Sequence, residues 1–218
     1  MTSLPPVAPK RPNVPSNLGA RELGDERLTG LRVTEAELGG DLSERAAADL
    51  RFDEARLDQL DLSGTEAPGL TLNDAIVAAG SWANLRATRG RLTRVAVEDL
   101  RATGVDLGET TLKDVTFAGS RLDLASFRFA KLERVAFADC RLEEADFYGA
   151  ELSSVRFERC NLTAAIFSAA RCERSEIRDC QLADLQGVEG LGGVRMPWPD
   201  VMQLTGLLAA ATGIVVVD

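Results

Sequence analysis

A five-residue repeat constrains the fold of this chain more than any other feature of its sequence. An α-helix repeats every 3.6 residues and a flat strand every two, so neither places a strict five-residue repeat on one face. The repeat, which is most regular from Leu112 to Phe167, therefore predicts a coil in which each five-residue unit turns one large side chain inward. The large residues alternate between leucine and phenylalanine: Leu112, Phe117, Leu122, Phe127, Leu132, Phe137, Leu142, Phe147, Leu152, Phe157, Leu162 and Phe167.

The repeat extends well beyond this stretch in both directions. In one unbroken frame, every fifth residue from Leu42 to Leu182 is apolar, although only 45% of the chain is hydrophobic. A weaker repeat of Leu28, Val33 and Leu38 precedes it, one residue out of frame. Most of the chain therefore belongs to one repetitive core.

Composition excludes several classes of function. The 218 residues include no histidine, which removes Ser-His-Asp and Cys-His catalysis and histidine-ligated metal sites. A net charge of −9 argues against nucleic acid or an anionic membrane as a direct ligand. The chain shows neither a membrane span nor a signal peptide, and four cysteines then indicate free thiols in the cytoplasm. We expect a cytoplasmic protein with no catalytic residue, cofactor or metal.

The tandem repeat resembles the A(D/N)LXX pattern of the pentapeptide-repeat family. The resemblance covers the frame from Leu42 to Leu182. It implies an all-β fold, the right-handed quadrilateral parallel β-helix, in which four pentapeptides make one coil. Repeat proteins of this kind need caps at their ends.

A coil of twenty residues sorts the inward side chains into columns. Phenylalanines form two opposite columns, and we expect each ring to stack on the next. Three cysteines fall in a further column at a small inward position, where a thiol ladder could suggest a metal or redox site. Because zinc needs ligands around a point rather than along a line, we interpret them as core residues. The predicted core columns are Phe117, Phe137 and Phe157; Phe127, Phe147 and Phe167; and Cys140, Cys160 and Cys180.

Changes of composition divide the chain into three parts. Residues 1–17 are proline-rich and predict a disordered arm. Residues 28–187 form the β-helix, with a regular frame from residue 42. Residues 188–218 predict a cap helix that starts at Pro197-Trp198-Pro199-Asp200, followed by a terminal strand over residues 214–217.

The apolar C-terminal end resembles the dimerising end of the fluoroquinolone-resistance pentapeptide proteins. We expect it to form a homodimer, because an exposed apolar strand edge invites pairing. The alternative is that the tail folds back on its own last coil. The predicted interface comprises Trp198, Leu204, Leu208, Ile214, Val215, Val216 and Val217.

Some apolar residues occupy outward positions of the repeat. Phe129, Tyr148 and Ile166 fall on one side of three successive coils and predict a patch for a protein partner. The alternative for Phe129 is packing at a corner of the coil.

Two functions remain open from the sequence. The resemblance implies a non-enzymatic rod that imitates B-DNA and binds or modulates DNA gyrase or another DNA-binding protein. However, residues 42–187 carry 25 acidic and 19 basic residues, far fewer net charges than B-DNA has at one per about 1.7 Å. The alternative is a generic protein–protein interaction scaffold with no DNA mimicry.

Overall fold

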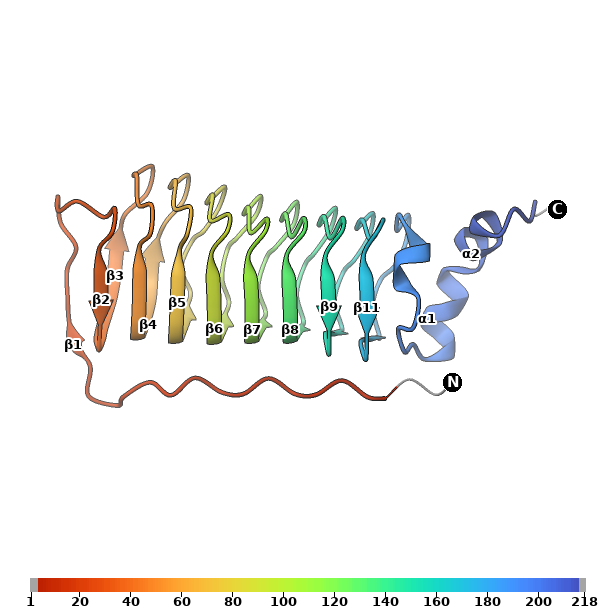
Figure 1. Cartoon of the computed structure of the whole chain (residues 1–218), viewed down its shortest axis with the longest axis horizontal. Helices are drawn as coiled ribbons and strands as arrows, with labels where there is room; N and C mark the ends of the chain where they lie inside the picture. The colour runs from red at the N-terminus through yellow and green to blue at the C-terminus, as the bar shows by residue number, and fades with distance from the viewer. Residues whose placement is uncertain (1–3, 216–218) are drawn as a thin grey trace.

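The chain forms a straight rod of parallel strands, closed at one end by two short helices (Figure 1). The structure is a computed structural model that describes residues 4–215. The rod has about eight turns. Its elements are β1 (Gly19–Ala20), β2 (Arg32–Thr34), β3 (Ala36–Asp41), β4 (Arg51–Asp61), β5 (Thr71–Ala78), β6 (Arg91–Glu98), β7 (Thr111–Ala118), β8 (Lys131–Ala138), β9 (Glu151–Ser153), β10 (Arg156–Glu158), β11 (Arg171–Glu173), β12 (Glu176–Arg178), η1 (Val188–Leu191), α1 (Trp198–Gln203) and α2 (Thr205–Ala211).

Each coil has four faces, one for each pentapeptide. In one coil, face 1 is centred on Leu122, face 2 on Phe127, face 3 on Leu132 and face 4 on Phe137. The other coils repeat these faces at steps of twenty residues, so that Leu112 pairs with Leu132 and Phe117 with Phe137. Faces 3 and 4 carry the long strands β4 to β8, whereas faces 1 and 2 are joined by isolated parallel bridges.

A left-handed residue turns the chain at every corner. The residue two after each centre from Leu42 to Leu182 has a positive φ, from 48° at Asp74 to 77° at Gly69. Glycine, asparagine and aspartate tolerate this conformation best, and they fill many of the corners. The polar residues of the repeat therefore have a backbone role as well as a solvent-facing one.

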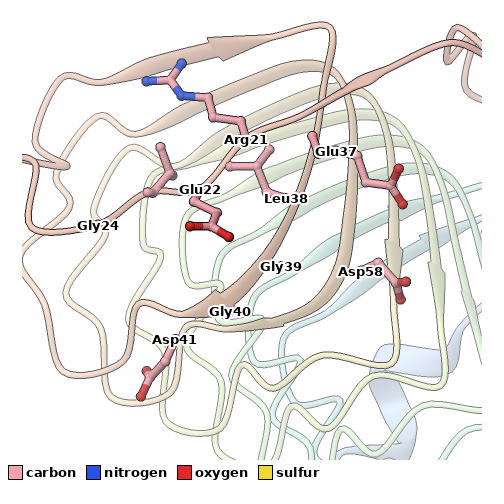
Figure 2. A pocket seen from close by; sticks show the side chains of 11 residues that line it. Arg21, Glu22, Gly24, Glu37, Leu38, Gly39, Gly40, Asp41 and Asp58 are labelled. Carbon is pink, nitrogen blue, oxygen red and sulfur yellow. The ribbon is translucent and has the colours of Figure 1, made fainter.

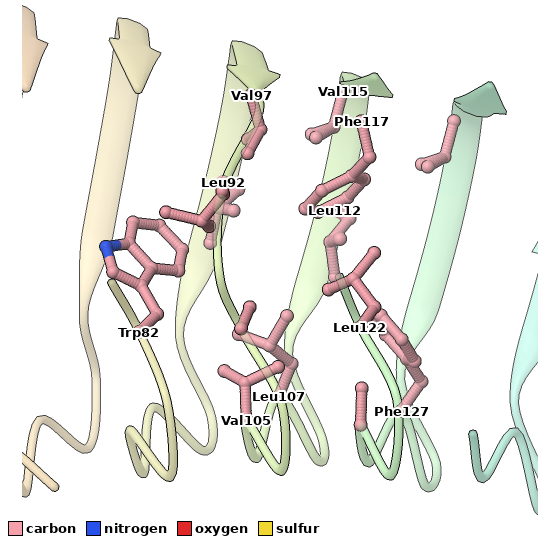
Figure 3. Close-up of a cluster of buried hydrophobic side chains, with 14 of the residues drawn as sticks. Trp82, Leu92, Val97, Val105, Leu107, Leu112, Val115, Phe117, Leu122 and Phe127 are labelled. Atoms are coloured by element: carbon pink, nitrogen blue, oxygen red, sulfur yellow. The ribbon is translucent and has the colours of Figure 1, made fainter. Parts of the chain in front are cut away.

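The core consists of the predicted columns of side chains. Phe117 and Phe137 stack with their centroids 5.0 Å apart and their planes at 4°, and Phe127 stacks on Phe147 at 4.9 Å and 2°. Rings of the two columns also meet edge to face across the interior, as between Phe147 and Phe157 at 5.6 Å. The predicted columns are confirmed. Figure 3 shows where this part of the core continues into the coil that contains Trp82 and Leu92.

The coil of β2 and β3, the first after β1, is one residue shorter than the regular coils that follow it. Leu38 pairs with Leu57, nineteen residues on, whereas Gly40 pairs with Leu60, twenty residues on. The bulge between them brings Gly39 so close to the strand beside it that an added Cβ would lie 2.6 Å from the carbonyl oxygen of Asp58. The frame shift seen in the sequence is therefore accommodated by a glycine.

The C-terminal cap differs from its prediction. The expected single helix is divided at Leu204 into α1 and α2, and Ile214 and Val215 form no strand. Side chains of α1 accept hydrogen bonds from backbone N–H groups at the edge of the last coil. Asp200 accepts from the Asp179 N–H at 2.8 Å, and Gln203 accepts from the Leu182 N–H at 3.1 Å. Val216 and Val217, expected in the terminal strand, lie outside the described residues.

The proline-rich arm also differs from its prediction. We expected residues 1–17 to be disordered, but the described residues from Leu4 onward lie extended along the rod, from β1 towards the cap (Figure 1). The backbone N–H groups of Lys10 and Asn13 donate to Asp114 and Asp74 on the rod. Docking against the rod offsets the lack of a core within the arm.

We expect Phe147→Ala to lower the free energy of unfolding by about 3–5 kcal/mol, because it leaves a cavity between two stacked rings. Denaturant unfolding monitored by circular dichroism measures this change. Tyr148→Ala, next along the chain but facing outward, is the control. A loss under about 1 kcal/mol for Phe147→Ala would contradict its place in a close-packed core.

Candidate functional site

The most distinctive group on the outer surface lies on face 2 and consists of Arg128, Phe129, Asp146 and Tyr148, here called the face 2 cluster. Phe129 and Tyr148 meet edge to face with centroids 5.5 Å apart. The Arg128 guanidinium lies 4.6 Å from the Tyr148 ring centroid and donates to Asp146 at 2.6 Å. The charge pair holds the arginine over the ring, so the cluster presents aromatic and cationic surface together.

The Phe129 side chain extends outward from a corner of the coil. Phe129 is a corner residue with φ 57°, a conformation that costs a bulky side chain about 1–2 kcal/mol. Phe129 is 54% exposed as a residue, so core packing does not offset this cost. The corner beneath it is Gly149, where an added Cβ would lie 2.7 Å from the Phe129 ring. The other corners of the regular coils also have a positive φ, so the exposed aromatic ring, and not the backbone, distinguishes Phe129.

The structure brings together two of the three residues of the predicted patch. Phe129 and Tyr148 touch, while Ile166 is half-buried on the same face and pairs with Asp146 in the ladder. Phe129 does lie at a corner, as the alternative has it, and its ring contacts the next corner at Gly149, but the residue remains more than half exposed. Sequence reasoning missed Arg128 and Asp146. The twenty-residue step from Arg128 to Tyr148 is the signal that could have found them.

Charged residues on the rod are paired between neighbouring coils. Arg94 with Asp74, Arg134 with Asp114 and Arg159 with Asp139 are each twenty residues apart. Further pairs at the same step join lysines and arginines to glutamates, in Lys113–Glu133, Lys131–Glu151 and Arg86–Glu66. Acidic and basic groups therefore alternate along these columns.

The cysteine column behaves as part of the core. Cys140, Cys160 and Cys180 are buried and free, and the Cys140 and Cys160 thiols donate to backbone carbonyls. A hydrogen bond with Cys140 raises the pKa of Cys160 to about 12, and burial raises the pKa of Cys172 to about 11. These two thiols stay protonated and unreactive. Within residues 4–215 no cluster of acids or cysteines is arranged to hold a metal ion.

A hollow of about 710 Å³ lies at the N-terminal end of the rod, beside the bulge of the shortened coil (Figure 2). Glu22, Glu37, Asp41 and Asp58 line it, and the nearby Arg21 pairs with Glu26. Gly39 and Gly40, at the bulge of the shortened coil, form part of the wall of the hollow.

The C-terminal end exposes apolar surface. Trp198, Met202, Ile214 and Val215 are each at least half exposed, and Leu208 is partly exposed. A groove of about 360 Å³ runs between η1 and the two helices, lined by Val188, Leu191, Val194, Met196, Val201, Leu204 and Leu208. Leu204, which we expected in a dimer interface, is instead buried within its own cap.

The exposure of Val215 bears on the alternatives for the tail. Val215 is 83% exposed, so this part of the tail does not fold back on the last coil. Among the described helices, none is long and apolar enough to cross a membrane.

Comparison with known proteins agrees with the architecture. Residues 90–167 and 110–187 match the model of the pentapeptide repeat region. No curated protein sequence matches the chain.

Several solved structures are similar to the chain. Two trypsin-treated forms of QnrB1, a plasmid-mediated fluoroquinolone resistance protein, are 20% and 16% identical, with TM-scores of 0.43 and 0.41. These alignments cover 92% and 93% of this chain and 96% and 100% of theirs. HetL, a pentapeptide repeat protein involved in heterocyst differentiation regulation in the cyanobacterium Nostoc, is 15% identical with a TM-score of 0.31, over 80% of this chain and 93% of its own.

We expect Phe129→Gly to be more stable than Phe129→Ala by about 1 kcal/mol, because glycine adopts a positive φ without a steric cost. Both variants lose the ring, so the difference in their free energies of unfolding isolates the backbone strain. Parallel denaturant melts give this difference. An alanine variant as stable as the glycine variant would show that the corner is unstrained.

Proposed function

We propose that this chain, which carries a pentapeptide repeat region over residues 90–187, is a non-enzymatic rod that binds a protein partner through the face 2 cluster. The observation that carries the proposal is the exposed Phe129 side chain, in contact with the Tyr148 ring and beside the Arg128 guanidinium. Aromatic residues and arginine dominate the binding energy of many protein interfaces. The absence of histidine and the burial of Cys140, Cys160 and Cys180 in the core favour binding over catalysis.

The partner to test first is DNA gyrase, which the resemblance to the fluoroquinolone-resistance members indicates. In that function the acidic rod would stand in for B-DNA. The net charge of −9 supports an acidic surface, whereas the pairing of arginines with aspartates along the rod reduces its likeness to DNA. That pairing favours the second candidate, a scaffold that binds a partner without imitating DNA.

We expect the intact protein at micromolar concentration to change the rate of gyrase supercoiling, and Phe129→Ser with Tyr148→Ser to weaken the effect at least about tenfold. Leu124→Ser is the matched control, since Leu124 is a corner residue of the same coil as Phe129, with φ 60° and 55% exposure, and is not part of the face 2 cluster. An intact protein without effect on supercoiling would reject gyrase as the partner and leave the scaffold. Equal effects of both variants would reject the face 2 cluster.

We also propose a homodimer formed through the C-terminal end. The exposed Trp198, Met202, Leu208, Ile214 and Val215 would be covered by a second copy, and the neighbouring groove offers a place for its apolar tail. The free thiols are suited to a reducing compartment, and we expect the dimer to work in the cytoplasm.

Light scattering tests the dimer. We expect twice the chain mass of 23.4 kDa for the intact protein and a monomer for a chain truncated after Thr212, because the tail supplies exposed apolar surface. A truncated chain that remains dimeric would exclude the tail as the interface.

A further inference from the structure

The proline-rich arm turns one side towards the rod at every third residue. Pro6, Pro9, Pro12 and Pro15 are half-buried, and the residues between them, apart from Val14, are exposed. A polyproline II helix has three residues per turn, so prolines at this spacing share one side of it. The arm thus has the period of polyproline II and uses its prolines as the contact surface.

The period of the arm matches the period of the rod. The Lys10 N–H donates to Asp114 Oδ1 at 3.0 Å, and the Asn13 N–H donates to Asp74 Oδ1 at 2.9 Å. These donors are three residues apart, which is about 9.3 Å in polyproline II. The acceptors are two coils apart, which is about 9.6 Å at the spacing of neighbouring strands. Two successive turns of the arm therefore meet equivalent positions, two coils apart, on the rod.

Both acceptors are held in place by arginines of the next coil. Arg94 bonds Asp74, and Arg134 bonds Asp114 through Nε at 2.6 Å and Nη2 at 2.8 Å. These hydrogen bonds are the main cause that lowers the pKa of each aspartate, so both remain charged. The carboxylates are therefore fixed, charged acceptors for a backbone N–H.

An uncharged floor lies beside these acceptors on face 4. Its outward, half-buried residues are Ile76, Ala96, Thr116 and Ala136, one on each of four successive coils, and Arg56 and Arg156 flank the run. Residues 6–9 of the arm lie against Val135, Ala136 and Arg156, with which they enclose a cavity of about 30 Å³. This surface, together with Asp74 and Asp114, is here called the face 4 track.

The anchoring hydrogen bonds come from backbone N–H groups, and the buried side chains are prolines. The track therefore recognises the polyproline II conformation and prolines at every third residue, rather than a particular series of other side chains. We propose that the face 4 track is a binding site for Pro-x-x-Pro segments in the polyproline II conformation. The arm occupies it in cis, and a proline-rich segment of a partner protein binds the track by displacing the arm.

Trypsin cleavage of the full chain tests the contacts of the arm. The Lys10–Arg11 bond is the cleavable bond of the arm, since Pro12 protects the bond after Arg11. We expect Asp74→Ala with Asp114→Ala to raise its cleavage rate about tenfold, because two hydrogen bonds are lost. Asp139→Ala is the matched control. It removes a similar aspartate–arginine pair, in which Arg159 donates to Asp139 at 2.7 and 2.9 Å, at the opposite edge of face 4 from Asp74 and Asp114.

Binding of a peptide tests the specificity of the track. The probe is a synthetic peptide of residues 4–17 carrying a fluorophore, titrated against full chains and followed by anisotropy. We expect saturable binding to a chain in which Pro6→Ala, Pro9→Ala and Pro12→Ala weaken the contact of its own arm with the track. Binding to the wild-type chain should be at least about tenfold weaker, because its own arm competes at high effective concentration. A peptide with the same three substitutions should not bind. Because these substitutions lie in the arm, they leave the rod core intact.

The remaining outcomes overturn the proposal. Equal peptide binding to both chains, or none to the weakened chain, would show that the track does not recognise Pro-x-x-Pro segments. Equal cleavage of the wild type and the double aspartate variant would show that the arm is not anchored as described. Protection that falls on dilution would assign the track to the arm of a second copy and reject the arrangement in cis.

Discussion

The twenty-residue register between coils is the constraint on which the rest of this structure depends. Because each coil repeats the backbone of its neighbour, a residue meets the residue twenty positions away, whatever the two are. Phenylalanine then meets phenylalanine in the core, as Phe137 meets Phe117, and arginine meets aspartate on the surface, as Arg134 meets Asp114. The same register aligns Asp74 with Asp114 and so creates two equivalent anchors for the arm. The packing of the core, the pairing of surface charges and the anchoring of the proline-rich arm all follow from the twenty-residue period.

The core could be predicted because burial and sequence have the same period. Any inward position of the repeat that carried a charge would leave it unpaired in the interior, so the apolar pattern alone identifies the columns. The bulge at Gly39 was also visible, as a one-residue shift between Leu38 and Leu42. The division of the cap at Leu204 was not, since an apolar residue at helical spacing favours a continuous helix.

The outer surface could be predicted much less completely. Phe129 and Tyr148 were recognisable as apolar residues at outward positions, but Arg128 and Asp146 resemble any solvated charge until the coils are stacked. The arm was missed for a similar reason. Its composition is typical of disorder, and the period of three in its prolines acquires meaning only beside a surface with a commensurate repeat.

The cap on the last coil has a consequence for assembly. A stack of parallel coils ends in unpaired backbone groups, which offer a template for another chain to extend the ladder without limit. The side chains of Asp200 and Gln203 accept hydrogen bonds from the backbone N–H groups of Asp179 and Leu182, which such a chain would otherwise bind. The solenoid is thereby prevented from growing from this end into a filament, and it keeps the length that its own sequence encodes.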